Sequence, residues 1–184
     1  MEPTLFKDSE VVTKQRPDKL SENQKAEIYN RLAQEIIDGG WSKHDISDII
    51  EDLKGLSKND SGYEKAKELE NGFNSKARYG IDTSFIEWLD FFDDEFSDVV
   101  RENVKTWVKA HDIKPKFEIG TQLTISRYIS IAPELKVGNN IYVNNIRESE
   151  AQYGVSPEKD SNLNYIINYE TIESGCEVIN QEHE

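Results

Sequence analysis

The sequence lacks the patterns by which many enzymes and metalloproteins are recognised. It has no glycine-rich phosphate loop, no His/Cys spacing typical of zinc, and no pattern that pairs a nucleophile with a base. An EF-hand loop is disfavoured as well, because the acidic run Asp90–Glu95 has no glycine for the central turn. We therefore expect no enzyme activity, no cofactor, no metal and no catalytic residues. A hydrolase with an unrecognised carboxylate site stays an open alternative.

Cysteine and long apolar runs are scarce too. The single cysteine, Cys176, cannot close an internal disulfide, which is typical of proteins in the reducing cytosol. No apolar run reaches the roughly 18 residues of a membrane span. Met1–Leu20 has no apolar core of the kind found in secretory signals. We expect a cytoplasmic protein without membrane contact.

Basic residues are outnumbered by acidic ones. The chain has 22 Lys and Arg against 36 Asp and Glu, and its formal net charge is −14. Proteins that bind nucleic acid directly normally carry a basic patch. We therefore expect little nucleic-acid binding by the helical part described below, and a basic protein as the partner.

The first part of the chain has helical periodicity. After a polar segment at 1–20, expected to be a flexible N-terminal arm, residues 21–113 predict an acidic helical domain of about four helices. Each helix is expected to begin at a serine that serves as its N-cap. These serines are Ser21, Ser42, Ser61 and Ser84. The third helix is expected to run to about Arg78, with Tyr63 and Phe73 on its apolar face. The fourth helix is expected to reach about Ala110 unless it breaks near Asp93 and Asp94. The first two helices are expected to form a helical hairpin, whose apolar face could also form a homodimer seam.

The pattern changes after Ile113, where apolar residues begin to alternate with a period of two. Residues 114–180 predict a small β-rich domain of five short strands, and 181–184 form a polar tail. The expected fold is α+β, with a helical bundle followed by a small antiparallel β-sheet or barrel. The alternating residues are Leu123, Ile125, Ile129 and Ile131, then Ile141 and Val143, then Leu163, Tyr165, Ile167 and Tyr169.

The densest charge lies between Gly80 and Val100, where seven carboxylates occur without one Lys or Arg. Four of them fall within about 80° on a helical wheel at 100° per residue, and Phe91 falls among them. We call these four the acidic stripe: Glu87, Asp90, Asp94 and Asp98.

The acidic stripe has two interpretations. It is either a partner-binding surface with Phe91 as an aromatic anchor, or the solvated face of an amphipathic helix with Phe91 covered by another element. Like charges four residues apart each destabilise a helix by about 0.2–0.5 kcal/mol. Either packing or a function must compensate for this cost.

The β-rich part is rich in Tyr and Asn, which suit recognition surfaces because they combine contact area with adaptable hydrogen bonds. Arg127, Tyr142 and Arg147 are the candidate residues of a second partner contact. The alternative is that alternating tyrosines only cover a small sheet, since aromatic residues are enriched in strands.

In size, acidity and lack of catalytic motifs, the chain resembles the small acidic inhibitors that bacteriophages and mobile elements make against host nucleases. These are the anti-restriction and anti-CRISPR proteins. The resemblance implies a non-enzymatic inhibitor that occupies the basic nucleic-acid groove of a nuclease or another nucleic-acid-binding protein. An immunity protein or antitoxin that neutralises a basic toxin is the alternative.

Overall fold

The computed structural model describes residues 15–71, 77–129 and 135–179. The chain forms two compact units. The helical unit comprises Pro17–Glu102, and the β unit combines the chain up to Arg16 with the chain from Asn103 onward. Each unit is described by itself.

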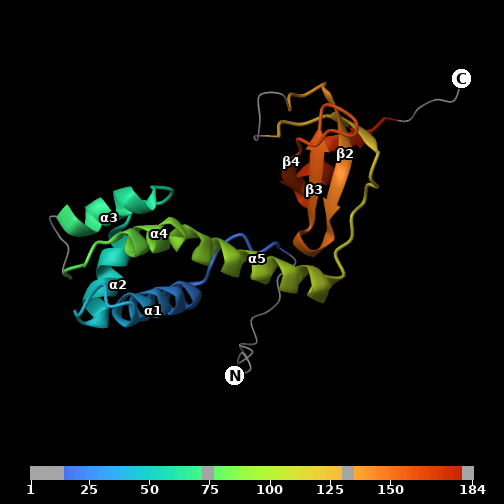
Figure 1. Ribbon diagram of the computed structural model, residues 1–184. Coiled ribbons are helices and arrows are strands. Elements are labelled where there is room, and N and C mark those ends of the chain that lie inside the picture. Colours follow the sequence, from blue (N-terminus) through green and yellow to red (C-terminus); the bar gives the residue numbers. More distant parts are fainter. Residues whose placement is uncertain (1–14, 72–76, 130–134, 180–184) are drawn as a thin grey trace, which may run out of the picture. The chain divides into compact units, whose positions relative to one another are not determined.

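The fold is α+β, as the periodicity predicted. The helices are α1 (Glu22–Asp38), α2 (Ile46–Gly55), α3 (Gly62–Asn71), α4 (Thr83–Asp90) and α5 (Phe92–His111) (Figure 1). Only Phe91 separates α4 from α5, so the two form one long bent helix and account for the fourth predicted one. The α5 helix continues from the helical unit into the β unit.

Two predicted helix starts are confirmed by reciprocal hydrogen bonds. The Gln24 amide donates to the Ser21 hydroxyl at 3.2 Å, and the Ser21 amide donates to the Gln24 side chain at 3.1 Å. Ser61 and Glu64 make the same exchange at 3.3 and 3.0 Å. Such a pair satisfies two amides that have no partner inside the helix, which makes the motif reliable in sequence.

Two predicted starts are wrong. The α2 helix begins after Asp45, and Ser42 is instead a buried residue in an isolated β-bridge to Tyr79. The α4 helix is capped by Asp82, whose carboxylate accepts hydrogen bonds from the Phe85 amide at 2.8 Å and from a neighbouring serine hydroxyl. Aspartate and serine are equally good N-cap residues, so the presence of a serine nearby does not fix where the helix begins.

The end of α3 also differs from the prediction. The helix ends at Asn71, and residues 77–80 are not helical. Phe73, which was expected to extend its apolar face, lies outside the described residues.

Aromatic rings fill the core of the helical unit. Phe85 is fully buried, with the rings of Trp41, Tyr79 and Trp88 at 5.0, 5.9 and 5.8 Å. Trp41 follows the glycine pair that ends α1, and Tyr79 lies in the segment before α4. The ring of Phe85 thus joins three segments of the chain.

The β unit contains an open, five-stranded antiparallel sheet in the order β4-β3-β2-β1-β5. Of the two predicted forms, sheet or barrel, the structure is therefore a sheet. A short 3-10 helix, η1 (Glu148–Glu150), joins β2 to β3, and α6 (Tyr169–Gly175) joins β4 to β5. The strands are β1 (Gln122–Ile125), β2 (Asn140–Arg147), β3 (Gln152–Ser156), β4 (Tyr165–Asn168) and β5 (Cys176–Val178).

Three residues of the predicted strands lie elsewhere. Ile129 is buried but follows β1 outside the sheet, and Leu163 is 84% exposed before β4 begins. Tyr169 starts α6, with its ring 4.3 Å from that of Tyr153. A buried side chain at the first helical position continues the alternation of the strand before it. Periodicity alone therefore cannot tell the last residue of a strand from the first residue of a following helix. Ile131 and the tail at 181–184 lie outside the described residues.

Candidate functional site

The acidic stripe lies on both sides of a bend at Phe91. This residue has φ −92° and ψ 0°, and its amide donates to the Trp88 carbonyl at 3.2 Å while its carbonyl accepts from the Asp94 amide at 3.0 Å. Its side chain is 64% exposed. The bend is therefore a change of direction at one residue, and its aromatic ring faces solvent.

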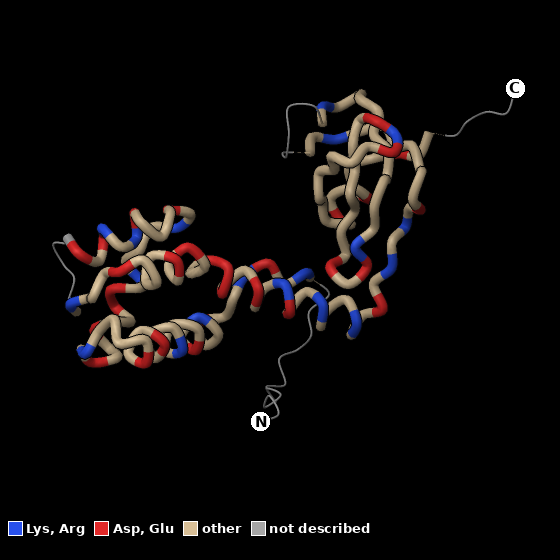
Figure 2. Tube along the Cα trace, in the orientation of Figure 1, with Lys and Arg blue, Asp and Glu red and all other residues tan. Residues whose placement is uncertain are grey.

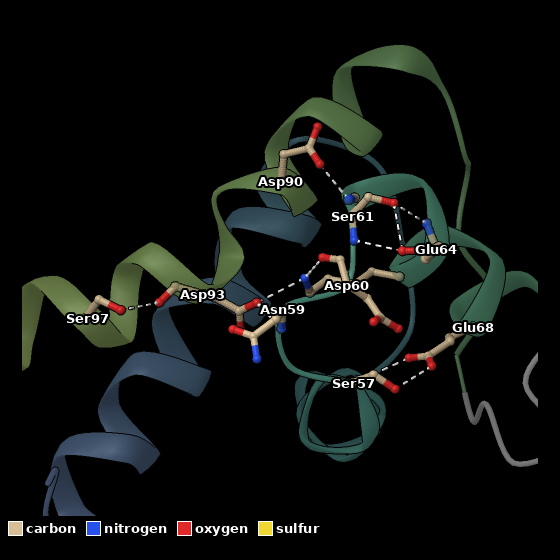
Figure 3. A network of polar contacts seen from close by, with 11 residues as sticks. Ser57, Asn59, Asp60, Ser61, Glu64, Glu68, Asp90, Asp93 and Ser97 are labelled. Carbon is tan, nitrogen blue, oxygen red and sulfur yellow. Dashed lines mark hydrogen bonds and ion pairs between the residues drawn. The ribbon is translucent and has the colours of Figure 1, made fainter. Parts of the chain in front are cut away.

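Two carboxylates at the bend support the fold of the helical unit. Asp90 accepts a hydrogen bond from the Gly62 amide at 2.5 Å. Asp93 accepts one from the Asn59 amide at 3.0 Å and lies 3.0 Å from the Lys65 ammonium (Figure 3). Both carboxylates bind the start of α3 and the loop before it. Asp90 was predicted as a partner-binding residue, and the structure gives it this contact within the fold.

Lys65 is the residue that sequence reasoning missed. Its side chain is 1% exposed, and its ammonium donates to the Asp60 carbonyl in addition to pairing with Asp93. A signal was present, because buried residues of α3 recur at i, i+3, i+4 and i+7, and Lys65 occupies the second of these positions. The four are Gly62, Lys65, Ala66 and Leu69. Tyr63, expected on this face, is 55% exposed.

Gly62 is required by the close approach of α3 to α4. A Cβ at this position would lie 2.1 Å from the Ile86 carbonyl oxygen and 2.8 Å from the Asp90 amide nitrogen, both backbone atoms that cannot rotate away. We expect Gly62→Ala to lower the free energy of unfolding by about 1–3 kcal/mol or more, through overpacking. Urea unfolding followed by tryptophan fluorescence measures the change.

Gly55→Ala is the matched control, since a Cβ at Gly55 meets nothing within 4 Å. We expect it to be neutral or to stabilise the helical unit by up to about 1 kcal/mol, because alanine restricts the unfolded chain. Equal losses of stability in both variants would contradict the close packing of α3 on α4.

The other acids of the stripe are exposed, as Asp90 is, but their carboxylates do not bind another segment. The carboxylates of Glu87 and Asp94 make no hydrogen bond or ion pair within the described parts of the chain, and Asp98 pairs with Arg101 of its own helix at 2.6 Å. Asp and Glu positions recur along α4 and the first half of α5 (Figure 2). With Phe91, these three define the exposed acidic surface: Glu87, Phe91, Asp94 and Asp98.

The surroundings of this surface are fixed by further polar contacts. Hydrogen bonds from a neighbouring serine and from the Phe85 amide hold the pKa of Asp82 below its usual value at the start of α4. Glu95 bonds to Arg31 of α1 at 2.6 Å, and this contact raises the pKa of the guanidinium. The helices that carry the surface are thus held in place by other acids.

The three candidate partner-binding residues of the β unit lie at separate positions, and no contact between them is observed within the described residues. Arg127 is exposed after β1, while Tyr142 and Arg147 lie on β2. A register shift between Val143 and Asn145 adds a residue to β2, so Arg147 shares a side of the sheet with Tyr142. Arg147 is half exposed, 3.8 Å from Glu150.

No group of His, Cys, Asp or Glu within the described residues is arranged to hold a metal ion. Within the same residues, none of the helices combines the length and apolarity that a membrane crossing requires. Cys176 is buried, and this burial raises the pKa of its thiol to about 11. The described side chains therefore offer neither a metal-binding cluster nor an activated thiolate.

Comparison with known proteins adds no relative. No family model matches the sequence, and no curated protein or solved structure is significantly similar to it.

Proposed function

We propose that this chain is a non-enzymatic interaction protein whose exposed acidic surface binds a basic groove on a nucleic-acid-binding protein and excludes the nucleic acid. The observation that carries the proposal is Phe91, an aromatic side chain 64% exposed at the bend and surrounded in sequence by exposed carboxylates. More specifically, we propose an inhibitor of the anti-restriction or anti-CRISPR type, the class that the sequence resembles.

An exposed aromatic ring and nearby charges have different roles in binding. Burying Phe91 in a pocket of the partner supplies affinity, because a few central aromatic residues carry most of the binding energy of an interface. The surrounding carboxylates steer a basic partner into place and raise the association rate. Exposed charges are screened over about 10 Å at 0.1 M salt, so binding should weaken as the salt concentration rises.

Asp90 is left out of the binding set. Because its carboxylate accepts the Gly62 amide, neutralising it would loosen α3 and confuse a loss of binding with a loss of structure. The test variant is therefore Glu87→Gln/Asp94→Asn/Asp98→Asn, which removes three exposed charges.

The test is a quantitative pull-down from bacterial lysate at about 0.1 M and about 1 M salt. We expect the wild type to capture a nucleic-acid-binding protein at low salt, and the triple variant to bind it about tenfold more weakly, from up to about 1 kcal/mol per exposed charge. We expect Phe91→Ala to weaken capture by more than tenfold, as at an interface hot spot.

The control variant is Glu27→Gln/Glu118→Gln/Glu158→Gln, which removes the same charge from exposed positions outside α4 and α5. It should bind like the wild type. Equal capture by all folded variants, or a partner without nucleic-acid affinity, would reject the proposal.

A further inference from the structure

Within the β unit, the side chain of Arg16 contacts residues that are far from it in the sequence. Its guanidinium donates to the Glu150 carbonyl at 2.7 Å and to the Ala151 carbonyl at 3.3 Å, and it lies 3.9 Å from the Glu170 carboxylate. The side chain is only 14% exposed. An arginine in a segment that the sequence predicted to be a flexible arm is thus anchored by two carbonyl acceptors and an ion pair.

The acceptors are positioned by a tight corner of the fold. The η1 turn ends at Ala151, which is fully buried and has a left-handed backbone with φ 48°. The Ala151 amide donates back to Glu148, and its carbonyl also accepts the Tyr169 amide at 2.9 Å. The corner is therefore held by the start of β3 and the start of α6 as well as by Arg16, so its carbonyls remain available, with less protection, when Arg16 is removed.

We propose that this corner of the β unit is a guanidinium-binding site, filled in cis by Arg16 and able to accept the arginine of another peptide when Arg16 is absent. Arginine suits the acceptors, because its planar guanidinium offers several donors in a fixed fork. A lysine ammonium is a point charge and does not match two carbonyls and a carboxylate in the same way. The proposal rests on the β unit alone and is independent of the acidic surface.

The test uses the full chain with Arg16→Ala and measures amide hydrogen exchange at Ala151 and Tyr169. We expect exchange about tenfold faster than in the wild type, since a hydrogen bond to a charged group contributes more to stability than one between neutral groups. Arg16→Lys should behave like Arg16→Ala.

The probe is N-acetyl-arginine amide at millimolar concentration, with N-acetyl-lysine amide as the matched control. We expect the arginine compound to restore protection in Arg16→Ala, the lysine compound to have no effect, and Glu170→Gln to reduce the rescue in the double variant. Equal rescue by both compounds, no rescue, or wild-type exchange in Arg16→Ala would overturn the proposal.

Discussion

Asp93→Ala is expected to lower the free energy of unfolding of the helical unit by about 3–5 kcal/mol, the cost of leaving a buried charge without its partner. The charge is the Lys65 ammonium, whose side chain is 1% exposed and which lies 3.0 Å from Asp93. The same change also removes the acceptor of the Asn59 amide. Urea unfolding followed by tryptophan fluorescence measures the loss.

The double variant Lys65→Met/Asp93→Ala separates the charge from the packing. Replacing a buried ion pair with apolar side chains is often close to neutral, so the double variant should recover most of the stability that Asp93→Ala loses. A loss below about 1 kcal/mol in Asp93→Ala, the range of exposed pairs, would show that Lys65 reaches water.

Phe85→Ala is expected to cost about 3–5 kcal/mol, the usual range for a large aromatic side chain deleted from a core. Phe85 is fully buried between rings of two other segments and of its own helix, so the cavity cannot collapse without moving Trp41 and Trp88. The same unfolding experiment reports it, and the emission of the two tryptophans should change in the folded state.

Phe91→Ala is the matched control, because it makes the same chemical change at a ring that is 64% exposed. A substitution of this kind at the surface is expected to change stability by no more than about 0.5 kcal/mol. Similar losses at Phe85 and Phe91 would contradict the assignment of Phe91 to the surface.

The fold class could be predicted because its signals are local. Ser21 and Ser61 each precede a matching Gln or Glu by three residues, and the change of apolar period after Ile113 separates helices from strands. The wrong starts at Ser42 and Ser84 arose because each helix begins after a nearby aspartate. The aspartate before α4 caps its helix with its side chain, whereas the one before α2 makes no side-chain capping hydrogen bond. Local sequence patterns thus predicted the presence of helices and strands better than the residues at which they begin and end.

The sequence could not predict which acids contact other parts of the fold and which remain free of such contacts. Asp90 and Asp94 look alike in sequence, but Asp90 is bound to Gly62 across 28 residues of chain, whereas Asp94 has no such contact in the described residues. The partners of Arg16 are still farther away, at 134 and 135 residues. Contacts of this range depend on how the helices and strands pack, and a single sequence does not carry that information.

Some of these contacts compensate for the like-charge repulsion among the acids near the bend. Asp90 and Asp93 compensate for like-charge repulsion by accepting backbone amides and a buried ammonium. Glu87 and Asp94 receive no such compensation within the described residues. Their exposure beside Phe91 supports the proposed function.

The most direct test of the account is competition for the captured partner. A labelled oligonucleotide is bound to that protein at about 0.1 M salt, and fluorescence anisotropy is followed as this chain is added. The account predicts that the wild type and the Glu27/Glu118/Glu158 control release the oligonucleotide at the same concentration, while Phe91→Ala and the Glu87/Asp94/Asp98 variant need at least about tenfold more. A rise in anisotropy, which signals a ternary complex, or equal release by all four proteins would contradict it.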